Sequence, residues 1–340
     1  MHTNSINHFI KNIPKAELHL HIEGTLDAEL MFKIAERNNI KIKYKSVKEI
    51  SEAYNFENLE DFLKIYYEGA DVLIEEQDFY DLTWAYFLKA KEQNISHTEI
   101  FFDPQTHTSR KIKFSTVITG IYKAVEDAKS KLGISSKLIM SFLRHLDEES
   151  AINTLHEAKK YKNWITAVGL DSSEIGNPPS KFQNVFDKAR QFGFLTVAHA
   201  GEEGPSEYVW EALRLLKVSR VDHGNNSLDD ATLINELVKT KIPLTLCPLS
   251  NLKLKVVKDL EEHPLKKLLD KGVVVTINSD DPAYFGGDIN ENYHSITKAL
   301  NLSKEEIYQL CKNSFQASFL DENSKQKMIE KVDAFYRENL

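Results

Sequence analysis

The stretch His19-Leu20-His21-Ile22-Glu23-Gly24-Thr25 ends an alternating run that begins near Ala16. Side chains two positions apart on a β-strand point to the same face, so the imidazoles of His19 and His21 can reach one metal ion. A strand of alternating His and Leu is also typical of a polar face exposed to solvent, and the pair alone does not separate the two interpretations. Residues farther along the chain favour the metal site.

Seven further segments have the composition of buried strands. They are short runs of apolar and β-branched residues, and each is followed by a segment long enough for a crossover helix. Together with residues 16–22, the expected strands are 97–102, 137–143, 165–170, 194–199, 220–223, 243–247 and 273–278. Nearly continuous apolar strands are typical of a parallel sheet that is covered on both faces. Eight such units predict an α/β fold, the (β/α)8 or TIM barrel.

Two parts of the chain are longer than eight strand–helix units require. The connection after the first strand is much longer than the others, and its apolar spacing predicts a helical insertion over the mouth of the barrel. Its aromatic residues form either a lid over a flat ring or ordinary packing, and packing is the default for each of Tyr54, Phe56, Phe62 and Tyr66. The spacing of Ile307, Leu310, Cys311, Phe315 and Phe319 predicts a helical C-terminal extension from residue 300 onward. Because no linker or repeat interrupts the chain, residues 1–340 are expected to form one domain.

Composition limits the classes of partner. A net charge of -8 over 340 residues argues against nucleic-acid and membrane surfaces, which are polyanionic, and leaves small-molecule ligands possible. Cys247 and Cys311 are too few and too distant to form a disulfide framework. The N-terminus has no apolar signal segment, and no run reaches the roughly 18 apolar residues of a membrane span. The sequence therefore predicts a cytoplasmic protein and leaves its oligomeric state open.

Reactive residues collect where the expected strands end. His199 ends the fifth strand, His223 ends the sixth, and Asp280 and Asp281 follow the eighth, so all lie at the rim where such barrels place their active sites. A single histidine in such a position is usually a core residue, but four histidines with a carboxylate on one rim indicate a metal site. Imidazole and carboxylate ligands suit zinc, with iron or cobalt as alternatives, and such an ion lowers the pKa of water toward neutrality. The fourth strand lacks the lysine that bridges two metals in binuclear sites, which favours a single ion.

The turn after the fifth strand supplies a candidate acid. In His199-Ala200-Gly201-Glu202-Glu203-Gly204, Glu202 is expected beside the metal as a general acid or base in a dry pocket, whereas Glu203 is expected to be a solvated loop charge. His223 is expected to orient or deprotonate the water. Its neighbour Asp222 is expected to point away from the site and to be structural.

The two aspartates after the eighth strand should diverge. One of Asp280 and Asp281 can then bind the metal while the other faces the substrate. The alternative is that Ser279 or one of the two aspartates caps a helix that begins at Pro282. Cys247 lacks the neighbouring base expected of a nucleophile.

These motifs, taken in order, resemble the adenosine/adenine deaminase family of metal-dependent hydrolases. The similarity runs from about residue 14 to 290 and is carried by residues 19–25, 199–202, 222–224, 279–282 and Gly169-Leu170-Asp171-Ser172-Ser173-Glu174. It implies a (β/α)8 barrel with one zinc ion and a hydrolytic loss of ammonia from C6 of an aminopurine. The roles that it implies are zinc ligation by His19, His21, His199 and Asp280, proton donation to N1 by Glu202, assistance to the water by His223, and substrate contacts by Asp281, Glu23 and Gly169.

The resemblance also bears on the substrate. Adenosine deaminases usually have Asp where this chain has Glu23, and a longer side chain would take space that a ribose needs. Residues 175–182 and 283–287 are similar to those of the adenine deaminase branch. We therefore expect conversion of adenine to hypoxanthine and ammonia in purine salvage. The alternatives are an adenosine or N6-substituted adenine deaminase and a deaminase-like binding protein without turnover, although every residue that the chemistry requires is present.

Overall fold

The structure, a computed structural model, describes residues 6–339 and contains eight parallel strands in the order β1 to β8. The strands are β1 (Lys15–His21), β2 (Ile95–Phe102), β3 (Ser135–Leu143), β4 (Ile165–Asp171), β5 (Leu195–Ala200), β6 (Arg220–His223), β7 (Leu244–Leu246) and β8 (Val275–Ile277). The sheet closes just beyond β8, where the Asp280 amide donates to the His19 carbonyl at 3.1 Å and the His21 amide donates to the Asp280 carbonyl at 3.0 Å. The predicted (β/α)8 barrel is confirmed, and the eight expected strands overlap the observed ones.

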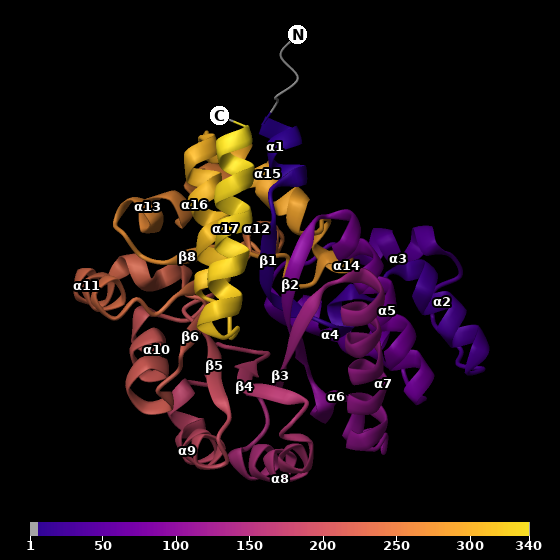
Figure 1. Ribbon diagram of the computed structural model, residues 1–340. Coiled ribbons are helices and arrows are strands. Elements are labelled where there is room, and N and C mark those ends of the chain that lie inside the picture. Colours follow the sequence, from indigo (N-terminus) through magenta and orange to yellow (C-terminus); the bar gives the residue numbers. More distant parts are fainter. Residues whose placement is uncertain (1–5, 340) are drawn as a thin grey trace.

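Helices surround the strands and account for the alternation in the sequence (Figure 1). For example, α11 begins after Asp230, whose side chain accepts from the Thr232 amide at 2.8 Å, and it buries Leu233 and Leu237 against the barrel. The helices are α1 (Ile6–Asn12), α2 (Ala28–Arg37), α3 (Val47–Ala53), α4 (Leu59–Ala70), α5 (Glu76–Glu92), α6 (Pro104–Thr108), α7 (Phe114–Asp127), α8 (Glu148–Ala158), α9 (Gln183–Gln191), α10 (Ser206–Glu211), α11 (Ala231–Thr240), α12 (Pro248–Lys253), α13 (Leu265–Asp270), α14 (Pro282–Phe285), α15 (Ile289–Leu300), α16 (Lys304–Gln316) and α17 (Glu322–Glu338).

The predicted insertion after β1 is confirmed and comprises α2 to α5. Figure 1 shows α2 and α3 extending to one side of the barrel. Helix α4 begins where the Asn58 side chain accepts from the Asp61 amide at 3.0 Å. Its apolar face, Leu59, Phe62, Leu63, Tyr66 and Tyr67, lines a cavity at the C-terminal ends of the strands.

The aromatic residues of the insertion divide into two groups. Phe62 and Tyr66 line the cavity and can cover a flat ring. Tyr54 does not line the cavity, and its ring lies 4.6 Å from that of Tyr284. Phe56 packs behind Phe62, with ring centroids 5.4 Å apart. Ordinary packing therefore accounts for Tyr54 and Phe56, whereas a lid over a flat ring stays a prediction for Phe62 and Tyr66.

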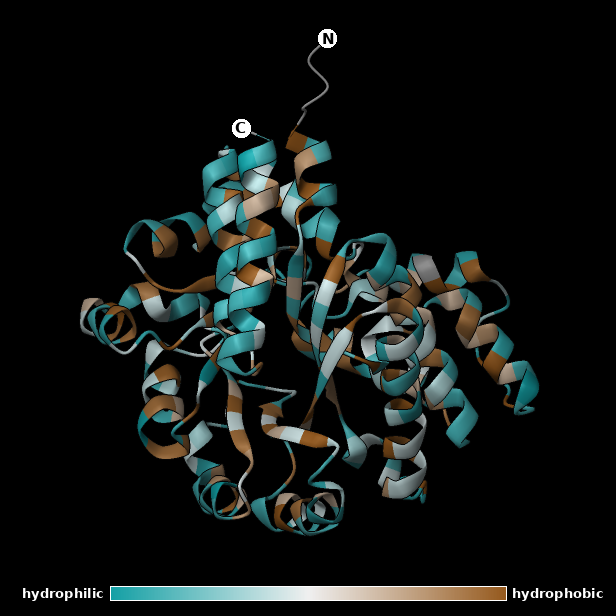
Figure 2. Ribbon diagram, in the orientation of Figure 1, coloured by the Kyte–Doolittle hydropathy of each residue, from teal (hydrophilic) through white to brown (hydrophobic). Residues whose placement is uncertain are grey.

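The helical C-terminal extension is also confirmed. Ile307, Leu310, Cys311 and Phe315 of α16 are buried, and α17 packs along α16 with a largely hydrophilic outer surface (Figure 2). Phe319, between these helices, packs against a buried layer of the barrel interior formed by Phe101, Ile139, Ala167 and Val197. Among residues 6–339, the helices are too short or too polar to span a membrane.

Candidate active site

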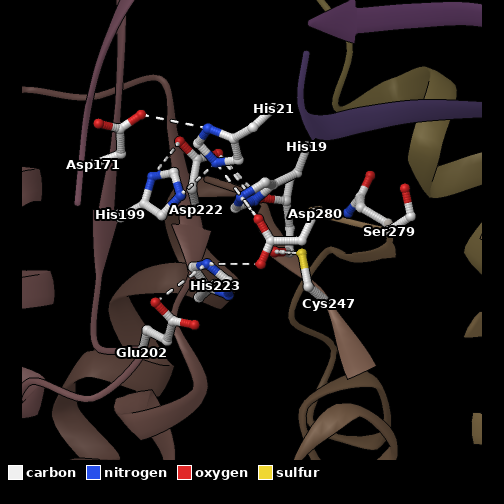
Figure 3. Close-up of polar contacts among 12 residues, drawn as sticks. His19, His21, Asp171, His199, Glu202, Asp222, His223, Cys247, Ser279 and Asp280 are labelled. Atoms are coloured by element: carbon white, nitrogen blue, oxygen red, sulfur yellow. Dashed lines mark hydrogen bonds and ion pairs between the residues drawn. The ribbon is translucent and has the colours of Figure 1, made fainter. Parts of the chain in front are cut away.

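Three histidines and one aspartate converge at the C-terminal ends of the strands (Figure 3). The ring nitrogens His21 Nε2 and His199 Nε2 lie 3.2 Å apart, and Asp280 Oδ1 lies 3.2 Å from His19 Nε2 and 3.5 Å from His21 Nε2. One ligand atom from each of the four residues lies within 4.8 Å of the others, and all four side chains are buried. The closure of the barrel at Asp280 therefore brings a residue from the end of the eighth strand to the histidines of the first.

The hydrogen bonds around His19 show that this cluster fits a cation. The Thr245 hydroxyl donates its one hydrogen to Asp222 Oδ1 at 3.0 Å. Because it has no second hydrogen, it must be the acceptor in its 2.9 Å contact with His19 Nδ1, so His19 Nδ1 carries the hydrogen. His19 Nε2 then carries no hydrogen, and its lone pair faces a carboxylate oxygen of Asp280. This nitrogen has no hydrogen-bond partner within the described part of the chain. Two acceptors at this distance repel each other, and a divalent cation between them would satisfy both.

The other two histidines are also backed by acceptors. His21 Nδ1 lies 3.5 Å from Asp171 Oδ2, and His199 Nδ1 lies 3.8 Å from Asp222 Oδ2, without a hydrogen bond in either pair. Acceptors behind the second ring nitrogen are typical of metal-binding imidazoles. The expectation that Asp222 points away from the site is wrong. Asp222 is fully buried behind the histidines, where Arg220 also pairs with it at 3.4 Å.

Two other groups of potential ligands overlap this one, and neither fits as well. One would use a thiol, and burial raises the pKa of Cys247 well above its usual range. The other would use His21 through the nitrogen that faces Asp171. In full, the two groups are His19, His223, Cys247 and Asp280, and His21, Asp103 and Asp171.

The backbone explains why neighbouring residues both reach the site. His223 and Asp280 adopt left-handed conformations, with φ of 63° and 65°, which ends the regular alternation of the strands. Both aspartates line the cavity. Asp280 also faces the histidines, and Asp281 makes no side-chain capping bond to α14. A Cβ atom at Gly24 would lie 1.9 Å from Asp281 Oδ1, so the glycine of the opening stretch makes room for this carboxyl group.

Burial and neighbouring charges shift the pKa values of these acids in opposite directions. Burial opposes the charge of Asp280, but positive charge at the histidines around it, first His19, holds its pKa below the usual range, and a cation bound there would act in the same direction. Burial and the charge of Asp280 raise the pKa of both Glu202 and Asp281 well above their usual range. A cavity that favours the ionised form of one carboxyl group and the protonated form of others suits metal binding and proton transfer at the same place.

A chain of hydrogen bonds assigns the tautomer of His223. The Leu265 amide donates to His263 Nδ1 at 3.2 Å, so His263 Nε2 is the donor to Asn251 Oδ1 at 3.1 Å. The Asn251 amide group then donates to His223 Nδ1 at 3.4 Å. Burial lowers the pKa of His223 to about 3, so the ring is neutral with its hydrogen on Nε2, 3.5 Å from Glu202 Oε2. His223 therefore presents a hydrogen-bond donor to the reaction site.

The turn that carries Glu202 is held by one carboxylate. The Glu174 side chain is buried and accepts hydrogen bonds from four consecutive backbone amides, residues 201 to 204, at 2.7 to 3.1 Å. The turn directs the Glu202 side chain inward and leaves Glu203 half-buried at its edge. Glu174 thus positions Glu202. The sequence did not predict this role of Glu174.

Replacing Glu174 by Gln is expected to misplace Glu202. An amide offers one acceptor oxygen and turns its own hydrogens toward backbone donors, so the turn would shift. Since a displacement of about 1 Å at a reacting group costs roughly 100-fold, we expect a fall in kcat of about that size. Steady-state kinetics with metal analysis measures this, and a Glu174→Gln protein with full kcat would show that the turn holds itself.

Two residues expected to contact substrate lie outside the cavity lining. The Glu23 carboxylate accepts from the Asp103 amide at 3.2 Å and from His107 Nε2 at 2.9 Å. A Cβ atom at Gly169 would lie 2.6 Å from Ser141 Oγ, so protein atoms already occupy the space beside this glycine. Asp103 and Ser172, which directly follow β2 and β4, line the cavity instead. Applying the strand-end rule to every strand would have found both residues.

Comparisons with known proteins agree with this geometry. Residues 14–335 match the family model described as adenosine deaminase. The chain is 62% identical over 324 residues to an adenine deaminase of Acinetobacter baylyi, covering 95% of this chain and 98% of the relative. The crystal structure of an adenine deaminase from Arthrobacter aurescens is 43% identical, with a TM-score of 0.94 over 96% of this chain and 99% of that one. A zinc-bound amidohydrolase from Burkholderia ambifaria, 24% identical, shares the fold with a TM-score of 0.90 over 100% of this chain and 95% of its own. This chain therefore belongs to the adenosine deaminase family of metal-dependent hydrolases.

Proposed function

We propose that the protein hydrolyses adenine to hypoxanthine and ammonia with one zinc ion per chain. One observation carries this proposal: a buried cavity combines a four-residue cation site with further carboxyl groups, among them Glu202 and Asp281. Relatives named adenine deaminase that are 55 to 62% identical over nearly the whole chain support adenine as the substrate. We place the reaction in purine salvage in the cytoplasm, in a chain that works as one domain.

The residues of the cavity divide the work. His19, His21, His199 and Asp280 would hold zinc, whose Lewis acidity makes water reactive at neutral pH. His223 donates a hydrogen bond through Nε2 and orients the attacking water. Glu202 protonates N1 of the purine, which makes C6 electrophilic, and Asp281 contacts N7 on the other side of the ring. Phe62 and Tyr66 cover the ring and exclude bulk water.

Turnover of three purines tests the proposal. The zinc-loaded protein is incubated separately with adenine, adenosine and N6-methyladenine, and ultraviolet absorbance and released amine are followed. We expect prompt release of ammonia from adenine and at least ~100-fold lower kcat/KM for adenosine, because a pocket shaped for one ligand discriminates strongly against a larger one. Turnover of adenosine without adenine would contradict the proposed substrate, and turnover of none would indicate a binding protein.

A further inference from the structure

One carboxyl group in the cavity has no role in the proposed chemistry. Asp103 directly follows β2, is 3% exposed and lines the cavity together with Glu202 and Asp281. Its Oδ2 accepts a hydrogen bond from the Tyr66 hydroxyl at 3.2 Å. Its Oδ1 is buried and meets no hydrogen-bond donor among residues 6–339. An unpaired buried oxygen costs about 1–3 kcal/mol, so a ligand that supplies a donor there gains affinity.

Hydrogen bonds connect Asp103 to Glu23 and, through His107 and Arg110, to the end of α4. Its amide donates to Glu23 Oε1, and His107 Nε2 donates to the same oxygen. Arg110 donates to His107 Nδ1 at 2.8 Å, which leaves the hydrogen of the neutral His107 ring on Nε2. The Arg110 guanidinium also donates to the carbonyls of Ala70, Asp71 and Leu73 at the end of α4. Asp103 is therefore fixed relative to both the opening stretch and the helix that covers the cavity.

The proposed chemistry leaves one edge of the purine to be recognised. With C6 at the cation site, N1 at Glu202 and N7 at Asp281, the polar atoms without a partner are N3 and N9–H. Ser172 Oγ is already engaged, at 3.0 Å from the Tyr67 hydroxyl and 2.8 Å from His145 Nδ1. Asp171 lies beside Asp103 and, like Asp103 Oδ1, its carboxyl oxygens have no hydrogen-bond partner among residues 6–339, but Asp171 Oδ2 faces the candidate ligand His21 at 3.5 Å. Of these two carboxyl groups, Asp103 is the one that does not back a candidate ligand, so we assign its Oδ1 as the acceptor for N9–H.

We propose that Asp103 accepts a hydrogen bond from N9–H of the substrate and thereby selects a free purine base over a nucleoside. This inference rests on the proposed function, because it assumes that C6 lies at the cation site. A carboxyl oxygen accepts such a bond whether or not the group is ionised. A nucleoside has no hydrogen on N9 and would place its sugar against the buried carboxyl group. On this inference Glu23 acts on specificity by fixing Asp103 rather than by filling the space of the ribose.

Removal of the carboxyl group tests the inference with a matched pair of substrates. Adenine and 9-methyladenine differ at N9 by one methyl group, and only adenine carries the N9–H donor. In the unmodified protein we expect kcat/KM for adenine to exceed that for 9-methyladenine by ~10⁴-fold, since sites built to bind a donor strongly reject analogues that lack it. In Asp103→Ala we expect kcat/KM for adenine to fall ~100-fold or more while that for 9-methyladenine stays equal or rises, so the ratio collapses.

Controls separate this role from a loss of structure and from a failure of the proposed function. Asp270→Ala, on the exposed side of α13, should leave both kcat/KM values unchanged. Zinc content and Tm report whether Asp103→Ala is folded, and if it is not, Asp103→Ser removes the same carboxyl group and tests the same ratio. If the unmodified protein turns over adenine and Asp103→Ala keeps the ratio of kcat/KM for adenine to that for 9-methyladenine, only the role of Asp103 would be overturned. Unmodified protein inactive on adenine would overturn the proposed function and this inference with it.

Discussion

Glu202→Gln is expected to abolish most adenine turnover while the protein keeps its metal. Glutamine matches the size of glutamate but has no proton to transfer to N1, and positioned acid catalysis contributes ~10²–10⁴-fold to rate. Glu202 is outside the four-residue cation site and meets His223 at 3.5 Å, so its replacement leaves the ligands intact. The measurement is kcat for adenine together with zinc per chain. Retained kcat would remove Glu202 from the proton-transfer role.

The chain supplies a matched control one residue away. Glu203 lies in the same turn, its amide donates to the same Glu174 carboxylate, and its side chain is only half-buried. Glu203→Gln changes charge and chemistry in the same way and should keep full kcat. If the two variants lost the same activity, the turn as a whole, and not the acid at position 202, would be responsible.

Asp280→Ala is expected to release the zinc ion and with it the activity. Asp280 is the one carboxylate of the four-residue set, and its loss leaves only the three histidines. Outer-shell partners alone cost about 10–100-fold in metal affinity, so removing a ligand should cost more than ~100-fold. Metal analysis after gel filtration measures zinc per chain. A protein that still holds one zinc would show that Asp280 is not a ligand.

Two further variants distinguish the loss of a metal ligand from a disturbance of the fold. Asp280 has a φ of 65°, which Asn tolerates better than Ala, so Asp280→Asn keeps the backbone and removes only the charge. It should also lose affinity for zinc. Asp281→Asn, at the adjacent position that lines the cavity, should keep the metal while kcat/KM for adenine falls. Equal metal content in Asp280→Asn and Asp281→Asn would contradict the assignment of the two aspartates.

The sequence predicted the barrel because its signals are local. Strands buried on both faces are apolar along their length, and the eight apolar runs coincide with β1 to β8. In a parallel barrel the C-terminal ends of all strands meet at one rim, so the strand order alone brings His19, His21, His199 and Asp280 together. The same reasoning located Glu202 and His223 at the cavity.

Only the tertiary structure decided where adjacent and buried polar side chains point. The alternation rule placed Asp222 away from the site, but the left-handed backbone at His223 ends the alternation, and Asp222 lies behind the candidate ligands. Glu23 belongs to the opening stretch, yet its carboxylate reaches Asp103 and His107, which come from the next strand end and from α6. Hydrogen bonds between residues so far apart in the chain leave no periodic signal in a single sequence. The sequence by itself determined the barrel and the residues at its rim, whereas the packing of distant strand ends decided that Glu174 holds the turn of Glu202 and that Asp103 lines the cavity.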